Sequence, residues 1–189
     1  VAKRDHAFPK GARPTVFMMS NPLPLPSREQ VERGVAAVTA DDNRWHRCDL
    51  KTTSLLGNVL MRQRAADLDA VETVMFRDGW LTEASASNVL IVRGGTIVAP
   101  PKDHQILPGI TYDATIEFAR EAGMPMEIRP VRREEALSAD EMWLSSSTKE
   151  VLAITTLDGR PFGSGVRGAV LRRMYAAFQA HKPAASRRA

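Results

Sequence analysis

The chain has 189 residues, of which 43% are hydrophobic and 25% charged, a composition typical of one globular domain or a domain with part of another. Its net charge of +4 comes from dispersed basic residues and only 6% of residues are aromatic, so no stacking platform for a nucleic acid is indicated. The pattern indicates neither a membrane span nor a secretory signal, and one cysteine, Cys48, cannot form an internal disulfide, so we expect a reduced cytoplasmic setting.

The first residues predict the end of one unit followed by a linker. Because the chain starts at Val1 rather than at a methionine, we expect it to be the downstream part of a longer protein. Residues 14–19 are mostly apolar and predict a strand that ends the preceding unit. Over 21–27, a proline at every second position favours a stiff, extended backbone, and this segment is predicted to be the linker.

Beyond the linker, the sequence predicts a helix and then two β-hairpins. Apolar residues at helical spacing, including Leu55, Leu56, Val59 and Leu60, predict a helix over 53–67 with one buried face. Two-residue turns, an Asp-Gly and a Gly-Gly, favour hairpins because such residues readily adopt positive φ. The strands that flank these turns are predicted at 71–77 and 80–84 and at 88–93 and 96–99.

The rest of the chain mixes helices and strands. Thr111 is expected to cap a helix that runs through Ala122 and is closed by Gly123. The later elements are predicted as strands at 126–131, 141–144 and 149–157, a short helix at 133–137 and a final amphipathic helix at 165–181. Because no regular strand-helix-strand repeat is present, an α+β fold with an antiparallel-rich sheet is predicted.

Lys51 is the first candidate for chemistry. It follows a short apolar element and immediately precedes the predicted helix at 53–67, next to hydroxyl side chains. A lysine in such a position can form a Schiff base with an aldehyde cofactor. Most lysines are solvated and do no chemistry, so the position of Lys51 leaves both interpretations open.

Three separate motifs carry a resemblance to a known family. They are Cys48-Asp49-Leu50-Lys51 with Ser54-Leu55-Leu56-Gly57, then Leu81-Thr82-Glu83-Ala84-Ser85-Ala86-Ser87-Asn88-Val89, then Ile106-Leu107-Pro108-Gly109-Ile110-Thr111-Tyr112-Asp113. In order and spacing they resemble the fold-type IV pyridoxal-phosphate aminotransferases, and within them the D-amino acid aminotransferases. The likeness runs from about the first residues to the Asp158-Gly159 turn.

The resemblance implies a fold-type IV architecture from which most of the N-terminal small domain is missing. On that basis 1–20 is the tail end of the small domain, 21–27 the interdomain linker, 28–182 the C-terminal domain that binds pyridoxal 5′-phosphate, and 183–189 a flexible tail. Family members take an arginine for the cofactor phosphate from the small domain. Nothing in these 189 residues corresponds to that arginine, so the site is expected to be incomplete.

The same resemblance assigns roles to residues of the motifs. Lys51 would hold the cofactor as a Schiff base and then move a proton at the substrate α-carbon. Glu83 would face the pyridine nitrogen, and Leu107 would pack on the ring. The phosphate would be bound by a helix N-terminus and by hydroxyl groups, from Gly109, Ile110, Thr111, Ser146 and Ser147. From the residues alone, Glu83 is also explained as a solvated carboxylate at a hairpin edge.

Arg4 and His6 complete the predicted site. Alternate residues of an extended segment share one side, so the two side chains point the same way. In D-amino acid aminotransferases an Arg-x-His pair binds the substrate carboxylate and is lent by the other subunit, which implies a homodimer. Without the resemblance, the pair would be assigned to a solvated chain terminus.

The implied activity is transfer of an amino group between a D-amino acid, such as D-alanine, and a 2-oxo acid, such as 2-oxoglutarate, with ping-pong kinetics. The alternatives are an aminodeoxychorismate lyase, a branched-chain or amine transaminase, a catalytically incomplete fragment and an anion-binding module. Leu56 stands where branched-chain enzymes usually carry a tyrosine, which disfavours that subgroup. No metal site is predicted, because His46, His104 and His181 lack ligand-like spacing.

Overall fold

The computed structural model describes residues 5–183, and residues 1–4 and 184–189 lie outside the described part. Its helices are α1 (Arg28–Arg33), α2 (Leu56–Asp67), α3 (Ile110–Glu121), α4 (Arg133–Leu137) and α5 (Ala169–His181). Its strands are β1 (Val35–Asp41), β2 (Glu72–Arg77), β3 (Trp80–Ala84), β4 (Asn88–Arg93), β5 (Thr96–Ala99), β6 (Met126–Ile128), β7 (Glu141–Ser146), β8 (Glu150–Leu157) and β9 (Arg160–Pro161). None of the described helices is long and apolar enough to span a membrane.

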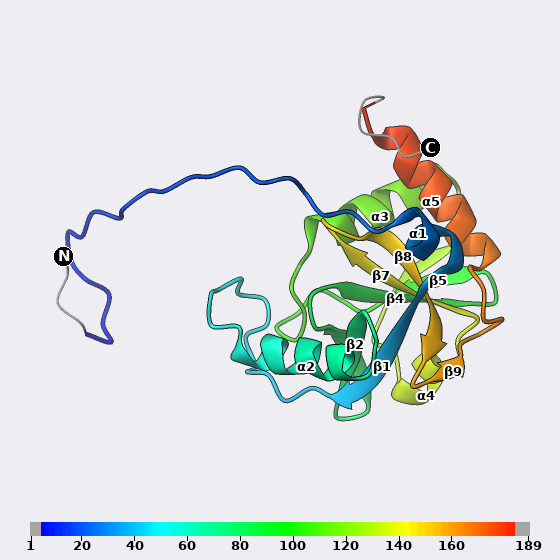
Figure 1. Cartoon of the computed structure of the whole chain (residues 1–189), viewed down its shortest axis with the longest axis horizontal. Coiled ribbons are helices and arrows are strands. Elements are labelled where there is room, and N and C mark those ends of the chain that lie inside the picture. The colour runs from blue at the N-terminus through cyan, green and yellow to red at the C-terminus, as the bar shows by residue number, and fades with distance from the viewer. Residues whose placement is uncertain (1–4, 184–189) are drawn as a thin grey trace.

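One curled sheet joins these strands in the order β3-β2-β1-β8-β7-β4-β5-β6, and β9 pairs with β8. The pairings of β1 with β2 and β8, and of β5 with β6, are parallel, whereas the other pairings are antiparallel. Helices α3 and α5 lie together on one side of the sheet, and α2 lies against β2 and β1 (Figure 1). The predicted antiparallel-rich α+β fold is therefore confirmed.

Both predicted hairpins are present, since local turn chemistry decides them. In the first, Asp78 and Gly79 have φ values of 52° and 80°. Such a turn matches the twist of antiparallel strands and sets Arg77 opposite Trp80. The Gly94-Gly95 turn does the same between β4 and β5, with φ values of 54° and 81°.

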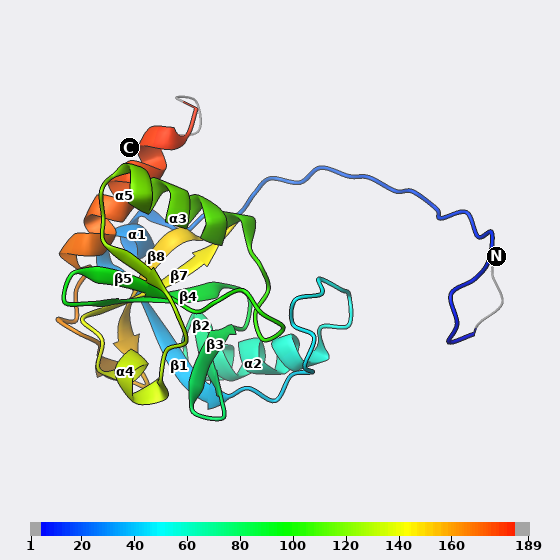
Figure 2. The ribbon, with the colours of Figure 1, turned by 180° about the vertical axis from the view of Figure 1, so that it is seen from behind.

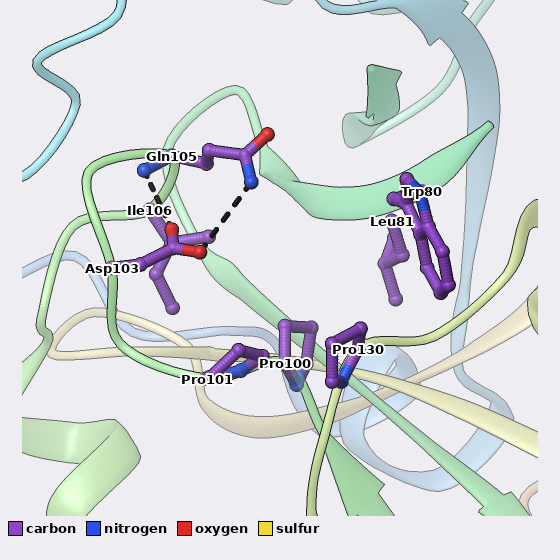
Figure 3. Close-up of a pocket in the computed structure, with 8 residues that line it drawn as sticks. All are labelled: Trp80, Leu81, Pro100, Pro101, Asp103, Gln105, Ile106 and Pro130. Carbon is purple, nitrogen blue, oxygen red and sulfur yellow. Dashed lines mark hydrogen bonds between the residues drawn. The ribbon is translucent and has the colours of Figure 1, made fainter. Parts of the chain in front are cut away.

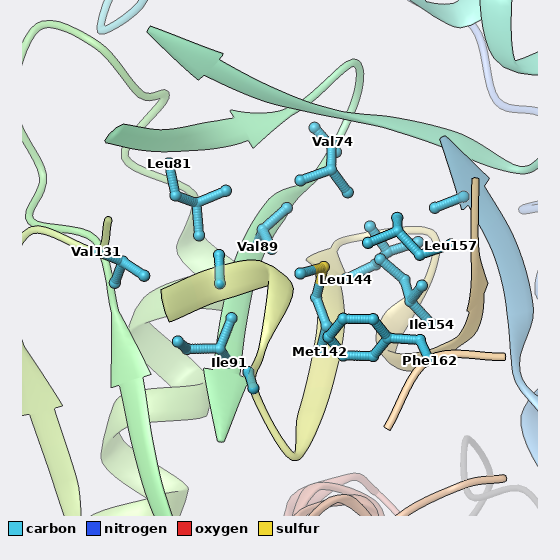
Figure 4. Close-up of a cluster of buried hydrophobic side chains, with 14 of the residues drawn as sticks. Val74, Leu81, Val89, Ile91, Val131, Met142, Leu144, Ile154, Leu157 and Phe162 are labelled. Atoms are coloured by element: carbon cyan, nitrogen blue, oxygen red, sulfur yellow. The ribbon is translucent and has the colours of Figure 1, made fainter. Parts of the chain in front are cut away.

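Strand side chains alternate between two buried layers. Along β7, Met142 and Leu144 belong to an inner core enclosed by the curled sheet, and Trp143 belongs to an outer core under α3 and α5. Figure 4 shows the inner core, where side chains from β2, β3, β4, β7 and β8 converge. Because both faces of the sheet are covered, the sequences of its central strands are continuous apolar runs and do not alternate between apolar and polar residues.

One predicted strand is absent, and the bounds of several predicted elements differ from those in the structure; for example, the helix predicted from 53 begins at Leu56. Residues 14–19 form no strand; they are exposed in a segment that extends away from the folded part (Figures 1 and 2), where no described strand lies beside them to complete a ladder. β6 ends at Ile128 rather than at 131, because Pro130 has no N–H for the ladder. α5 begins at Ala169 rather than at 165, since Gly165 has a φ of 71°.

Helix α2 is present, but its predicted buried face is wrong. Leu56 is 72% exposed, Val59 57% and Leu60 55%, whereas Met61 and Ala65 face the sheet. Helical spacing locates an apolar stripe without showing what covers it. The predicted division into the end of a small domain, a linker and a C-terminal domain stays a prediction, and most of the predicted tail at 183–189 lies outside the described residues.

Candidate active site

Glu83 lies near the end of β3 and is the centre of a buried polar cluster. Its side chain accepts hydrogen bonds from Arg44 Nη1 at 2.6 Å, from the Leu107 backbone N–H at 3.0 Å and from Asn88 Nδ2 at 3.1 Å. The residue is 5% exposed, so a solvated hairpin-edge carboxylate is excluded. Burial raises the pKa of Glu83 to about 7, and the Arg44 guanidinium opposes this rise only in part.

Asn88, the first residue of β4, joins Glu83 to the start of α3. Its Nδ2 also donates to the Leu107 carbonyl at 2.9 Å. A Cβ atom added at Gly109 would stand 2.5 Å from Asn88 Oδ1, so only glycine permits this approach. On its other side Asn88 pairs with Ser145 of β7. The asparagine therefore brings the Glu83 carboxylate, the α3 N-terminus and the end of β7 into one cluster.

The α3 N-terminus is open to an anion. Gly109 is its N-cap and no side chain caps the helix, so the expectation that Thr111 caps it is wrong. Thr111 lies inside the first turn, where its carbonyl accepts from Thr115 Oγ1 at 2.8 Å. Thr115 Oγ1 lies 3.5 Å from Ser145 Oγ, which sets the helix start beside the end of β7. The backbone N–H groups there and the helix dipole favour negative charge.

The hydroxyl run covers the last residues of β7 and continues into the tight turn between β7 and β8. Ser146 Oγ accepts from the Lys149 backbone N–H at 3.2 Å and lies 3.4 Å from Thr148 Oγ1. Ser146 is half-buried, whereas Ser147 is exposed. Both residues are thus placed near the cluster through Ser145, their neighbour along the chain.

Sequence analysis missed the residue that holds Glu83. Arg44 is 7% exposed and binds Asp42 through Nη2 at 2.8 Å and through Nε at 2.9 Å, while Arg77 approaches the same carboxylate at 3.0 Å. Burial raises the pKa of Asp42, but its bonds to Arg44 outweigh this and hold the pKa below its usual value. No local signal in the sequence pairs Arg44 with a glutamate 39 positions later.

A small cavity of about 160 Å³ adjoins the cluster but lacks its chemistry. Trp80, Leu81 and three prolines form most of its wall, and Asp103 and Gln105 bond to each other at its rim (Figure 3). Gln105 touches the cluster through its carbonyl, which accepts from Arg44 Nη2 at 3.4 Å. Because the wall is apolar, the cavity offers no set of donors for an anion.

Comparison with known proteins shows the family of this chain. The profile of the amino-transferase class IV family matches residues 2–157. This chain belongs to the class IV aminotransferase family. It is 38% identical over 178 residues to a D-alanine aminotransferase of Bacillus licheniformis, covering 94% of this chain and 62% of that relative. It is 35% identical over 179 residues to the Staphylococcus epidermidis enzyme of the same name, covering 94% and 63%.

Solved class IV structures share the fold. The branched-chain amino acid aminotransferase of Escherichia coli has a TM-score of 0.75 at 28% identity, over 82% of this chain and 53% of that one. A hypothetical aminotransferase from Mycobacterium tuberculosis in its PLP-bound form has a TM-score of 0.70 at 26% identity, over 78% and 55%. The chain therefore spans less than two thirds of the curated relatives and about half of these structures.

The structure brings together only some of the predicted class IV site residues. Glu83 and Leu107 meet directly, Gly109 is linked to Glu83 through Asn88, and Ile110 and Thr111 follow at the helix start. Lys51 lies in the exposed loop before α2 and has no hydrogen bond or ion pair within residues 5–183. His6 is exposed on the extended N-terminal segment, and Arg4 lies outside the described residues. The roles of Lys51, Arg4 and His6 stay predictions.

Proposed function

We propose that this chain forms the cofactor-binding part of a pyridoxal-phosphate-dependent transaminase that moves an amino group between a D-amino acid, such as D-alanine, and a 2-oxo acid, such as 2-oxoglutarate. The main support is the 34–38% identity to D-alanine aminotransferases over 94–95% of the chain. A neighbour of known structure was solved with pyridoxamine 5′-phosphate and another in a PLP-bound form.

The side chains and backbone of the cluster fit this cofactor. A phosphate dianion needs N–H and O–H donors, which the uncapped start of α3 and the serines at the end of β7 offer. A pyridine nitrogen needs a carboxylate that can hold a proton beside it, and Glu83 is a buried carboxyl whose pKa is about 7. Asn88 links these two parts of the site.

The chemistry that pyridoxal phosphate supplies when bound is an aldehyde that takes up an amino group and a ring that withdraws electrons. Glu83 would hold a proton at the ring nitrogen, and Arg44 and Asn88 keep its carboxylate from turning away. Lys51 would supply the primary amine that anchors the aldehyde and would then carry a proton from the substrate α-carbon. Leu107, held through its N–H by Glu83, would cover one face of the ring.

We further propose a homodimer that completes the site. The exposed apolar side chains of α2 and of the loop before it support this, because exposed apolar side chains that gather on one surface often contact another chain. These side chains are Trp45, Leu50, Leu55, Leu56, Val59 and Leu60. Arg4 and His6 of one subunit would then bind the substrate carboxylate in the other, with the guanidinium as a bidentate partner.

A branched-chain amino acid aminotransferase is the second candidate. It is supported by the fold, since the branched-chain enzyme of Escherichia coli and another one solved with pyridoxamine 5′-phosphate superimpose with TM-scores of 0.75 and 0.73. The identities to these enzymes are 28% and 26%, below the 34–38% identity to the D-alanine enzymes. The sequence therefore favours the D-amino acid reaction.

The decisive experiment combines cofactor trapping with a donor comparison on the full-length protein that contains this chain. After incubation with pyridoxal phosphate, we expect a visible near-violet absorbance band and, after borohydride reduction, a covalent adduct on Lys51. Lys51→Ala should abolish both, whereas Lys102→Ala, which removes an exposed lysine paired with Asp113, should keep both.

Amino transfer to 2-oxoglutarate is then measured with D-alanine and with L-leucine as donors. D-alanine should be the better donor if the proposal holds. A preference for L-leucine would favour the branched-chain reaction, and an absence of colour and adduct would contradict a pyridoxal-phosphate enzyme altogether.

A further inference from the structure

Glu72, the first residue of β2, is a buried carboxylate with no assigned role. It is 0% exposed. One of its oxygens accepts from Ser87 Oγ at 2.8 Å and lies 3.0 Å from Lys149 Nζ, while the other accepts from Ser85 Oγ. A carboxylate without access to water is costly unless its oxygens are bonded, and here both are bonded.

The partners of Glu72 come from two segments that reach the proposed site from different sides. Ser85 and Ser87 lie in the turn between β3 and β4, which separates Glu83 from Asn88 by four residues. This turn is further fixed by Asn58 of α2, whose Nδ2 donates to the Ser85 carbonyl at 2.9 Å. Through the two serine hydroxyls, Glu72 therefore fixes the turn that holds the ring-nitrogen carboxylate.

Lys149 lies on the phosphate side. Its backbone N–H donates at 3.2 Å to Oγ of Ser146, the last residue of β7. Its side chain is only 17% exposed, and its ammonium reaches Glu72 rather than solvent. The ion pair therefore ties the turn that carries Ser146 and Ser147 to the start of β2, and through Glu72 to the turn that follows Glu83.

We propose that Glu72 is a positioning residue that holds the ring side and the phosphate side of the cofactor site in one arrangement, an inference that rests on the proposed function. Fold stability alone does not require a carboxylate here, because an apolar residue of similar size in place of a buried ion pair is often neutral or stabilising. A charge that joins two turns instead restricts both, and a site held in advance binds its ligand without having to order it.

The test compares stability with cofactor affinity in four variants of the full-length protein. They are Glu72→Gln, Lys149→Met, the double variant of both, and Glu141→Gln as a matched control. Glu141 is also a multiply bonded carboxylate, which accepts from Trp143 Nε1 and from the Val170 and Leu171 N–H groups, but it lies at the opposite end of β7 from Ser146. Measurements are the Tm of the cofactor-free protein and the Kd of pyridoxal phosphate well below that Tm.

Glu72→Gln should weaken pyridoxal phosphate binding by about tenfold or more, the effect expected when a hydrogen-bonded charge is lost. Glu141→Gln should lower the Tm and leave the Kd unchanged. In the double variant no buried charge is left unpaired, so its Tm should recover towards that of the wild type while its Kd stays weak. A purely structural role would instead move the Kd and the Tm together.

The other possible results contradict the proposal, and they show whether the positioning role alone fails or the proposed function fails as well. If the wild type binds pyridoxal phosphate and Glu72→Gln binds it equally well, the positioning role is wrong and the proposed function stands. If the double variant recovers both Tm and Kd, Glu72 serves only to neutralise Lys149. If the wild type itself does not bind the cofactor, the proposed function fails and the positioning role fails with it. Should Glu72→Gln not fold, Ser87→Ala keeps the ion pair and must itself weaken binding.

Discussion

The end of β3 and the loop before α2 carry the two residues that the proposed reaction needs most, Glu83 and Lys51, and they are built in opposite ways. Glu83 is enclosed by the fold and bonded to Arg44, Asn88 and Leu107. Lys51 is exposed, next to a helix whose apolar face is open. In the proposed site, the side that holds the cofactor ring would therefore be built within this chain. The side that holds the lysine would lie next to the surface proposed for the second subunit.

The largest expected effect comes from breaking the buried ion pair between Arg44 and Glu83. Arg44→Met leaves Glu83 without its cation, and the loss of one partner from a buried ion pair costs about 3 to 5 kcal/mol of unfolding free energy. Arg47→Met is the exposed control, because the Arg47 side chain is 57% exposed where it pairs with Asp49 and such pairs contribute less than about 1 kcal/mol. Denaturant unfolding measures both, and equal losses would contradict the assigned role of Arg44.

The pH dependence of the unfolding free energy, which arises from Glu83, is the next largest expected effect. Because the folded pKa of Glu83 is about 7 and its ordinary value is 4.5, the folded state binds more protons than the unfolded state between these values. Unfolding free energy should therefore fall as pH rises from 4.5 to 7, by at most about 1.4 kcal/mol per pH unit. Denaturant titrations of the cofactor-free protein measure this slope.

Glu83→Gln provides the control for that slope. The glutamine does not titrate, so the variant should lose the part of the pH dependence that belongs to Glu83. His181, whose pKa is raised by the Ala177 carbonyl and by Glu121, loses its stabilising effect as pH rises above its ordinary value, and it does so in both proteins. An unchanged slope in Glu83→Gln would show that the titrating group lies elsewhere.

A smaller effect is expected where Asn88 meets α3. Gly109→Ala places a Cβ 2.5 Å from Asn88 Oδ1 and should cost about 1 to 3 kcal/mol, the usual range for overpacking. Asn88→Ala removes the obstructing atom, so Gly109→Ala should cost much less in that background. A double-mutant cycle from unfolding curves measures the coupling. Purely additive costs would mean that the clash is relieved elsewhere.

The smallest effect on monomer stability is expected on the exposed apolar face of α2. Leu56→Glu with Leu60→Glu changes exposed side chains and should alter the unfolding free energy of the isolated subunit by less than about 0.5 kcal/mol per substitution. Met61→Glu, on the buried face of the same helix, should destabilise it strongly. Sedimentation should show loss of the proposed dimer in the double variant, and an unchanged mass would place the subunit contact elsewhere.

The cluster around Glu83 shows how far sequence reasoning reaches. Glu83, Leu107 and Gly109 are recognised from motifs, because their neighbours along the chain are distinctive. Arg44 escapes, since an ion pair across 39 residues leaves no local pattern. The same holds for β1, whose run of small residues shows no alternation although it pairs in parallel with both β2 and β8.

The amino-acid sequence by itself determined the hairpin turns, most of the helices and the order of the family motifs, because each depends on residues close together in the chain. Only the tertiary structure decided that β1 lies between β2 and β8, that α2 turns Met61 rather than Leu56 towards the sheet, and that Arg44 binds Glu83. These outcomes depend on which distant segments compete for the same buried surface, and that competition is settled when the whole core packs.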